Sequence, residues 1–111
     1  MITTVGKLRN ITTGILHTNI DDVYEFFEIY TNEKGIMTHH LGSATKAMQP
    51  ILKTKLSKQW FYKKWNKLNN DLEWEVSNLT EDERKLFFSQ FNKYNLEVWN
   101  KMSNKSIIVK L

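Results

Sequence analysis

The residue types best suited to recognising another molecule gather in one basic and aromatic segment. The predicted binding residues are Lys53, Lys55, Lys58, Trp60, Lys63, Lys64 and Lys67. At 100° per helical residue, Trp60 lies away from the apolar stripe of Phe61 and Trp65 and on the side of the lysines. An exposed tryptophan can stack on bases or anchor a protein interface, and ammonium groups can pair with phosphates or carboxylates.

Three interpretations of this segment stay open. Its partner is an acidic protein surface or a nucleic acid, or else Trp60 packs under the N-terminal segment and the lysines are only solvated. Arg9 and Arg84 are the only arginines, which disfavours recognition of bases or carboxylates by bidentate guanidinium groups.

Motifs that would indicate catalysis are missing from the sequence. It has no phosphate-binding or dinucleotide-binding glycine motif, no serine-nucleophile elbow and no H-E-x-x-H zinc motif. The histidines are His17, His39 and His40, and on a helix the adjacent pair points about 100° apart. A metal site built from His17, one of that pair and an acid of residues 21–28 is a minor alternative. We predict that the chain is not an enzyme and has no catalytic residue, metal site or cofactor.

Length and composition favour one domain. The chain has 111 residues, a formal net charge of +4, a pI near 9.3 and 41% hydrophobic residues. It has no cysteine, which excludes disulfide scaffolds and thiol chemistry. No apolar run approaches the ~20 residues of a membrane span, and the N-terminus lacks the apolar segment of a signal peptide. We expect a single helical domain over residues 1–111 with an extended N-terminal segment, inside the cell and away from membranes.

Charge is arranged in blocks along the sequence. Residues 21–35 carry five acids against Lys34, and residues 36–70 carry seven lysines and no acid. Residues 71–83 carry six acids and no base, and residues 84–111 carry six bases against Glu97. Such blocks predict basic and acidic faces on one molecule, which suits a charged partner.

Hydrophobic spacing predicts a mainly α fold, a compact domain of four to five helices. The first twenty residues favour an extended segment, because their apolar residues are irregularly spaced. The next helix begins at Thr18 with Asp21 as a capping pair, and Gly35 ends it. Its apolar face carries Ile20, Val23, Tyr24, Phe27 and Tyr30.

Two more helical regions are predicted in the middle of the chain. Residues 38–49 form the first, with Thr38 or Ser43 as N-cap, and a break at Pro50 restarts it as a short helix to about residue 55. Ser57 is the predicted N-cap of the other.

The last third of the chain leaves one alternative open. Residues 72–76 either extend the helix from Ser57 or form a short strand, which their alternation slightly favours. A two- or three-stranded sheet of residues 11–16, 72–76 and 107–109 is therefore an alternative within the mainly α fold. A capping box from Thr80 to Glu83 begins the last helix, whose stripe is Phe87, Phe91, Tyr94 and Val98.

Several short motifs carry a resemblance to a known family. They are the run from Thr12 to Leu16, Tyr24, the run from Thr38 to Leu41, and Pro50 with Leu52. Over residues 11–76 the chain resembles a family of small phage and prophage proteins grouped as a domain of unknown function. Gly42 and Ser43 stand where that family has Pro-Arg. The resemblance implies a phage origin and no assigned activity.

These observations together predict a non-catalytic binding protein. Small size, missing catalytic motifs and the phage resemblance suit a protein that docks onto a macromolecule of the host or the phage. An inhibitor of a host defence protein such as a nuclease, acting in the cytoplasm of the host cell, is the specific expectation. A nucleic-acid-binding accessory protein that uses residues 53–67 is the alternative.

Overall fold

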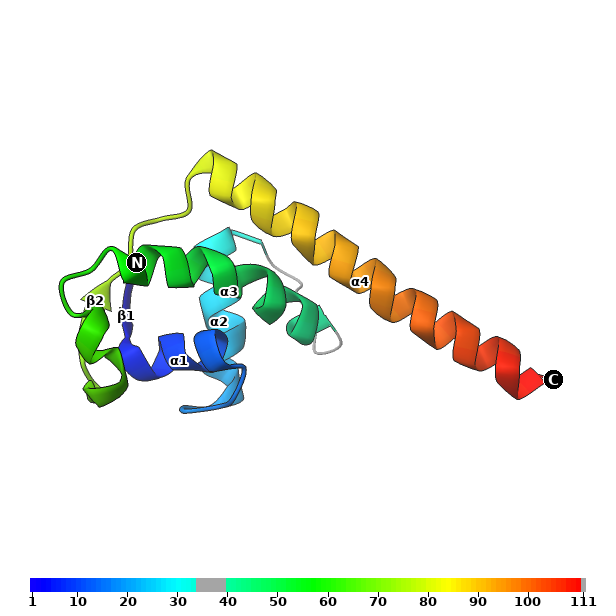
Figure 1. Cartoon of the computed structure of the whole chain (residues 1–111), viewed down its shortest axis with the longest axis horizontal. Helices are drawn as coiled ribbons and strands as arrows, with labels where there is room; N and C mark the ends of the chain where they lie inside the picture. Colours follow the sequence, from blue (N-terminus) through cyan, green and yellow to red (C-terminus); the bar gives the residue numbers. More distant parts are fainter. Residues whose placement is uncertain (34–39, 111) are drawn as a thin grey trace.

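The structure is a computed structural model that describes residues 1–33 and 40–110, with the side chains of the last helix described up to residue 101. Its elements, in chain order, are β1 (Ile2–Thr4), α1 (Val5–Thr13), α2 (Ile20–Thr31), α3 (Leu41–Ser57), the 3-10 helix η2 (Tyr62–Lys67), β2 (Glu73–Glu75) and α4 (Glu81–Lys110). Helices α1, α2 and α3 cluster beside the small sheet, and α4 packs on α3 and then projects from the body (Figure 1). The prediction of a mainly α fold with a small β element is confirmed.

The N-terminal segment is mostly helical, so the prediction of an extended first twenty residues is wrong from Val5 to Thr13. Thr4 caps α1 by accepting a hydrogen bond from the Lys7 amide at 3.3 Å, and Gly14 ends α1 with φ of 71°. Helix α1 buries Val5, Leu8 and Ile11. Their burial against α2 and α3 outweighs the weak helix propensity of the threonines, which is why local spacing misled the prediction.

Helix α2 forms where the sequence predicts it, but it begins later and ends earlier than predicted. Asn19, not Thr18, is the N-cap, and its side chain accepts a hydrogen bond from the Asp22 amide at 3.0 Å. Asn32 ends the helix in the left-handed region with φ of 56°. Gly35 and Thr38, to which the sequence assigned a helix stop and a cap, lie outside the described residues.

Helix α3 continues through Pro50, so the predicted break there is wrong. Proline removes one backbone donor, but Pro50 is exposed, and the turns on either side of it bury Ala47, Met48, Ile51 and Leu52. Packing on both sides therefore keeps one continuous helix. Ser43 lies within this helix and does not cap it.

The segment after α3 also differs from the prediction. Ser57 is the last residue of α3 rather than the cap of a new helix, and only η2 follows it. Residues 73–75 do form a strand, β2, which pairs antiparallel with β1 in the register Ile2↔Glu75, Thr3↔Trp74 and Thr4↔Glu73. The predicted strand partners are wrong, because residues 11–13 belong to α1 and residues 107–109 to α4.

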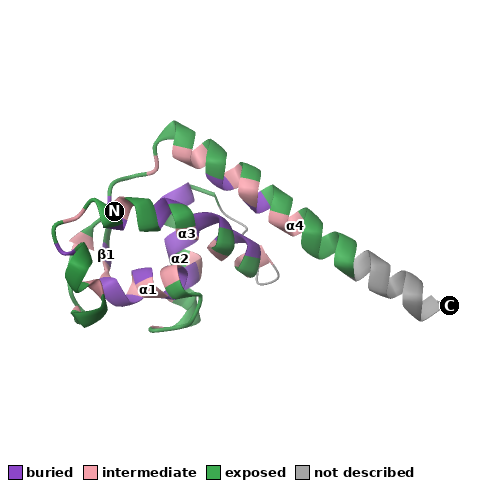
Figure 2. Cartoon of the chain, viewed as in Figure 1, coloured by how far each residue is buried: buried purple, intermediate pink, exposed green. Residues whose placement is uncertain are grey.

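Helix α4 begins at the predicted capping box. The Thr80 amide donates to Glu83 Oε1 at 2.9 Å, and the Glu83 amide donates to Thr80 Oγ1 at 3.1 Å. The predicted stripe is buried only in its first half, at Phe87 and Phe91, whereas Val98 is 46% exposed. Figure 2 shows this change along α4. The first half of α4 completes a core whose fully buried side chains include Phe26, Phe27, Phe87, Leu8, Ile11, Met48 and Leu52.

Candidate functional site

The predicted binding residues lie at the end of α3, in the turn after it, and in η2. Trp60 stands in the turn and is 87% exposed. Its predicted outward angle assumed a helix from Ser57, whereas residues 58–61 form a turn. The lysines around it are exposed as well. We define the Trp60 patch as Lys58, Trp60, Lys63, Lys64 and Lys67, and Lys53 lies on an exposed position of α3 earlier in the chain.

An aromatic cluster beneath the patch holds Trp60 at the surface. Phe61 is 6% exposed, stacks on Trp65 at 6.3 Å between centroids and meets Trp74 of β2 edge-on at 5.4 Å. Trp60 in turn meets Phe61 edge-on at 5.6 Å. Because Phe61 occupies the interior position, the neighbouring Trp60 ring is left in solvent.

Arg9 of α1 fixes η2 to the body of the protein. Its guanidinium donates to the Trp65 carbonyl and to Asn70 Oδ1, each at 2.5 Å, and lies 5.4 Å from the centroid of the Trp65 ring. A planar guanidinium can serve both acceptors at once, which an ammonium at the same place cannot do with the same geometry. Arg9 therefore joins η2, which carries part of the patch, to α1.

The patch has unbalanced positive charge. Among the residues that the structure describes, Lys58, Lys63, Lys64 and Lys67 form no ion pair. Their ammonium groups are therefore available to a partner that carries negative charge.

Lys55 is the exception among the predicted binding residues. Its ammonium pairs with Glu83 at 3.0 Å and donates to Ser77 Oγ at 2.8 Å and to the carbonyls of Ser77 and Asn78 at 3.2 Å. Its side chain is only 10% exposed. The structure therefore places Lys55 in a contact that joins α3 to α4, outside the Trp60 patch.

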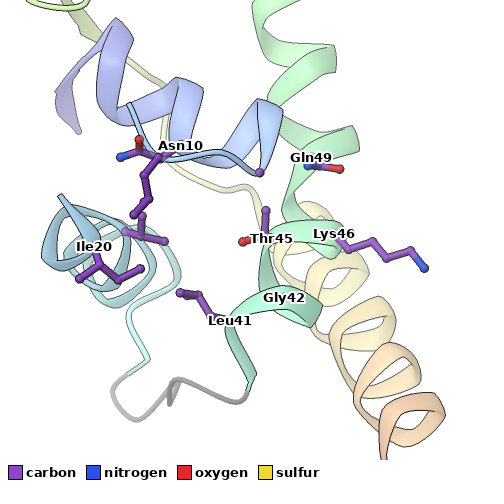
Figure 3. A pocket seen from close by; sticks show the side chains of 10 residues that line it. Asn10, Ile20, Leu41, Gly42, Thr45, Lys46 and Gln49 are labelled. Atoms are coloured by element: carbon purple, nitrogen blue, oxygen red, sulfur yellow. The ribbon is translucent and has the colours of Figure 1, made fainter. Parts of the chain in front are cut away.

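A hollow lies elsewhere, among α1, α2 and α3, and the sequence did not reveal it. Its volume is about 360 Å³, and its walls are Asn10, Gly14, Leu16, Ile20, Val23, Leu41, Gly42, Thr45, Lys46 and Gln49. In Figure 3, Ile20 and Leu41 approach the space from different helices, while Lys46 points away from it. The Lys46 ammonium instead lies over the Tyr94 ring, 4.2 Å from its centroid.

Asn10 organises the loop that forms one wall of this hollow. Its side chain is buried and accepts hydrogen bonds from the amides of His17 and Thr18 at 2.6 and 3.1 Å. It also donates to Thr18 Oγ1 at 2.6 Å. Gly14, with its positive φ, begins the same loop, so the Thr12–Leu16 motif was the signal for this wall in the sequence.

The histidines are spread over separate contacts. His17 lies 3.3 Å from Thr13 Oγ1 through Nε2, and the His40 ring meets Phe91 edge-on at 6.0 Å. His39 lies outside the described residues. Within residues 1–33 and 40–101, no group of three His, Cys, Asp or Glu side chains could hold a metal ion.

Comparison with known families gives a match to part of the chain. Residues 4–58 match a family described as a domain of unknown function. This segment is similar to DUF7736. The match contains α1, α2 and α3 and every residue around the hollow among them, and it ends at Lys58, before the rest of the Trp60 patch. It agrees with the predicted resemblance to a family of unknown function over residues 11–58. No curated protein and no solved structure matches the chain.

In the described part of the chain, no helix combines the length and the apolar character needed to cross a bilayer.

Proposed function

We propose that this chain is a non-catalytic binding protein that docks onto the acidic surface of a protein partner through the Trp60 patch. The observation that carries the proposal is the 87% exposure of Trp60 beside four lysines that have no acidic partner among the described residues. Covering a large exposed aromatic side chain buries much apolar area and so favours binding. Tryptophan is enriched among the residues that dominate binding energy.

The proposed roles of the patch residues differ. Trp60 anchors the interface, because Phe61 and Arg9 hold its surroundings in place and little order must be gained on binding. Lys63, Lys64 and Lys67 steer the approach of an acidic partner, since rim charges act mainly on the association rate. Tyr62, 47% exposed, adds apolar contact beside Trp60.

The narrower hypothesis is that the protein is of phage origin and that its partner is a host defence protein such as a nuclease. This stays a prediction, as does its action in the cytoplasm of the host.

The test compares captured partners across matched variants. Wild type, Trp60→Ala and Leu86→Ala serve as baits in host lysate, and bound proteins are identified by mass spectrometry. Leu86 is the control because it is a 50% exposed apolar residue on α4, outside the patch. The proposal predicts a protein that wild type and Leu86→Ala retain and Trp60→Ala loses.

A purified partner then gives the quantitative test. We expect Trp60→Ala to weaken binding by at least about 30-fold while the unfolding midpoint stays unchanged. Lys63→Glu with Lys64→Glu should slow association and flatten its salt dependence. Equal binding by Trp60→Ala and Leu86→Ala would contradict the proposal. Nucleic acid that co-purifies and leaves at high salt, with a salt slope that falls by about 1 per lysine removed, would assign the patch to nucleic acid instead.

A further inference from the structure

Another hollow lies between β1 and α2, and we call it the β1–α2 hollow. Its volume is about 220 Å³. The buried Phe26 ring lines it, together with Ile2 and Ile29, which are 70% and 54% exposed. Sites for drug-sized ligands measure roughly 300–1,000 Å³, so a molecule that fills this hollow must be small and must carry an apolar group.

Thr3 brings an unsatisfied hydroxyl group to this hollow. The residue is 4% exposed, and its Oγ1 is buried without a hydrogen-bond partner in the part of the chain that the structure describes. Most buried polar side-chain atoms of folded proteins are hydrogen-bonded, and one that is not destabilises the fold. Because Thr3 lines the hollow, a bound molecule can supply the missing partner.

The free edge of β1 adds a backbone donor and a backbone acceptor. The Val76 amide donates to the Met1 carbonyl at 2.9 Å, and the Met1 ammonium donates to the Val76 carbonyl at 3.0 Å. Hydrogen bonding alternates along an antiparallel pair, so the amide and the carbonyl of the next residue, Ile2, point away from β2. In Figure 1, α2 lies on that side of β1, and Ile2 lines the hollow. The main chain of Ile2 therefore offers both groups to a ligand there.

Charges of both signs surround the hollow. Asp22 and Glu25 of α2 and Lys7 of α1 line it. The Lys7 ammonium lies 4.0 Å from the Asp22 carboxylate, too far for a hydrogen bond, and Glu25 forms no ion pair within the described residues. A simple cation would meet Lys7, and a simple anion would meet two carboxylates. A small ligand that carries both charges beside an apolar group fits this set.

We propose that the β1–α2 hollow binds a free amino acid with an aliphatic side chain. The α-ammonium group donates to Thr3 Oγ1 and pairs with Asp22 and Glu25. The α-carboxylate accepts from the Ile2 amide and pairs with Lys7, while the aliphatic side chain covers Phe26. This site shares no residue with the Trp60 patch, so it stands or falls independently of the proposed protein partner.

The first test titrates L-valine, L-leucine and L-isoleucine into the full chain by isothermal titration calorimetry. We expect saturable binding of at least one of them, with a dissociation constant of about 1 mM or below. For the tightest binder, the N-acetyl derivative lacks the ammonium group and the amide derivative lacks the carboxylate. Each should bind at least about tenfold more weakly, because each loses one set of charged partners. Absence of saturable binding, or equal binding of the three forms, overturns the proposal.

The second test removes the unsatisfied hydroxyl. Thr3→Val keeps the shape of the side chain, so it should raise the unfolding midpoint of the ligand-free protein and weaken amino-acid binding at least about fivefold. Thr12→Val is the matched control, because Thr12 Oγ1 is also buried without a partner in the described residues but does not line the hollow. It should leave the affinity unchanged. Equal affinities of the two variants would contradict the proposal.

The third test removes one carboxylate from α2. Glu25→Gln should weaken amino-acid binding at least about tenfold, because the ammonium group loses a charged partner. Glu28→Gln removes an exposed carboxylate from the same helix outside the hollow, and it should bind as wild type does. A loss of the same size in both variants would show that only the net charge of α2 matters, which overturns the proposed site.

Discussion

The Lys55 ammonium lies 3.0 Å from the Glu83 carboxylate and joins the last turn of α3 to the first turn of α4. The same ammonium contacts Ser77 and Asn78 in the connection that precedes α4. Tyr30 of α2 donates to the Ser77 carbonyl at 2.7 Å, so three helices meet around one lysine. This contact sets where α4 begins and hence where Phe87 and Phe91 enter the core.

Replacing Lys55 by Met should therefore destabilise the fold. The change leaves Glu83 without its cation and removes the donor from Ser77 Oγ and from the Asn78 carbonyl, while the Ser77 carbonyl keeps Tyr30 as a donor. We expect a loss of about 1–2 kcal/mol in the free energy of unfolding. Lys53→Met, on an exposed position two residues earlier, should change it by less than about 0.5 kcal/mol. Urea denaturation followed by circular dichroism measures both, and equal effects would show that the contact contributes nothing.

The stability contributed by Glu83 should depend on pH. Burial alone would raise the pKa of its carboxyl, but the hydrogen bonds from Thr80 and Lys55 and the charge of Lys55 together hold the pKa below its ordinary value of 4.5. A carboxyl with a lowered folded-state pKa contributes stability that is fully present well above 4.5 and is lost as pH falls through the folded value. Denaturation measured from pH 7 to pH 3 should show this loss, and Glu83→Gln should lose less stability over the same range.

The first half of α4 should be sensitive to truncation of its core residues. Phe91 is 8% exposed and stacks on Phe87 at 5.6 Å, so Phe91→Ala should cost about 3–5 kcal/mol of unfolding free energy. Leu86→Ala, at a 50% exposed position on the same helix, should cost far less. A small effect at Phe91 would mean that α4 is not held to α3 in solution.

The sequence was sufficient where one segment determines its own structure. The Thr80–Glu83 capping box and the alternation around Trp74 each depend on neighbours within a few residues. The apolar face of α2 was predicted in part, because Val23, Phe27 and Tyr30 are buried, but Ile20 is 42% exposed and the buried Phe26 was not included. Contacts distant in sequence were not predictable. Residues 5–13 become helical because α2 and α3 cover Val5, Leu8 and Ile11, and α3 passes Pro50 because the core holds both of its sides.

The same distinction applies to the candidate site. Trp60 is exposed as expected, but the expected angle to Phe61 assumed a helix where residues 58–61 form a turn. The Arg9 contacts that fix η2 span 56 and 61 residues of sequence and could not be predicted from local spacing. The sequence could not distinguish Lys55 from the other lysines of residues 53–67. Lys55 is largely buried because it pairs with Glu83, which lies far along the chain. The hollow among α1, α2 and α3 likewise needs the helices in place before Asn10 and Leu41 can be seen to share it.

Arg9 should couple α1 to the geometry of the Trp60 patch. Arg9→Lys keeps the charge but loses the paired hydrogen bonds to the Trp65 carbonyl and Asn70. We expect faster hydrogen exchange at the amides of Lys64 in η2 and of Leu68 directly after it, measured by NMR or mass spectrometry, with little change at amides within α4. Unchanged exchange at those two amides would show that the Phe61 cluster alone fixes η2.

Two glycines should respond with opposite signs to the same substitution. A Cβ on Gly6 would lie 2.9 Å from Asn70 Cβ and 3.2 Å from the Asn70 carbonyl oxygen, while the Gly6 amide donates to that carbonyl at 2.9 Å. Gly6→Ala must therefore push α1 away from the segment before β2, and we expect a loss of roughly 1–3 kcal/mol in unfolding free energy. Gly42, in the first turn of α3, has no atom within 4 Å of the added Cβ, so Gly42→Ala should stabilise the fold by about 0.5 kcal/mol by restricting the unfolded chain. Thermal and urea unfolding of the two variants against wild type measures both signs, and a neutral Gly6→Ala would show that α1 does not pack closely on Asn70.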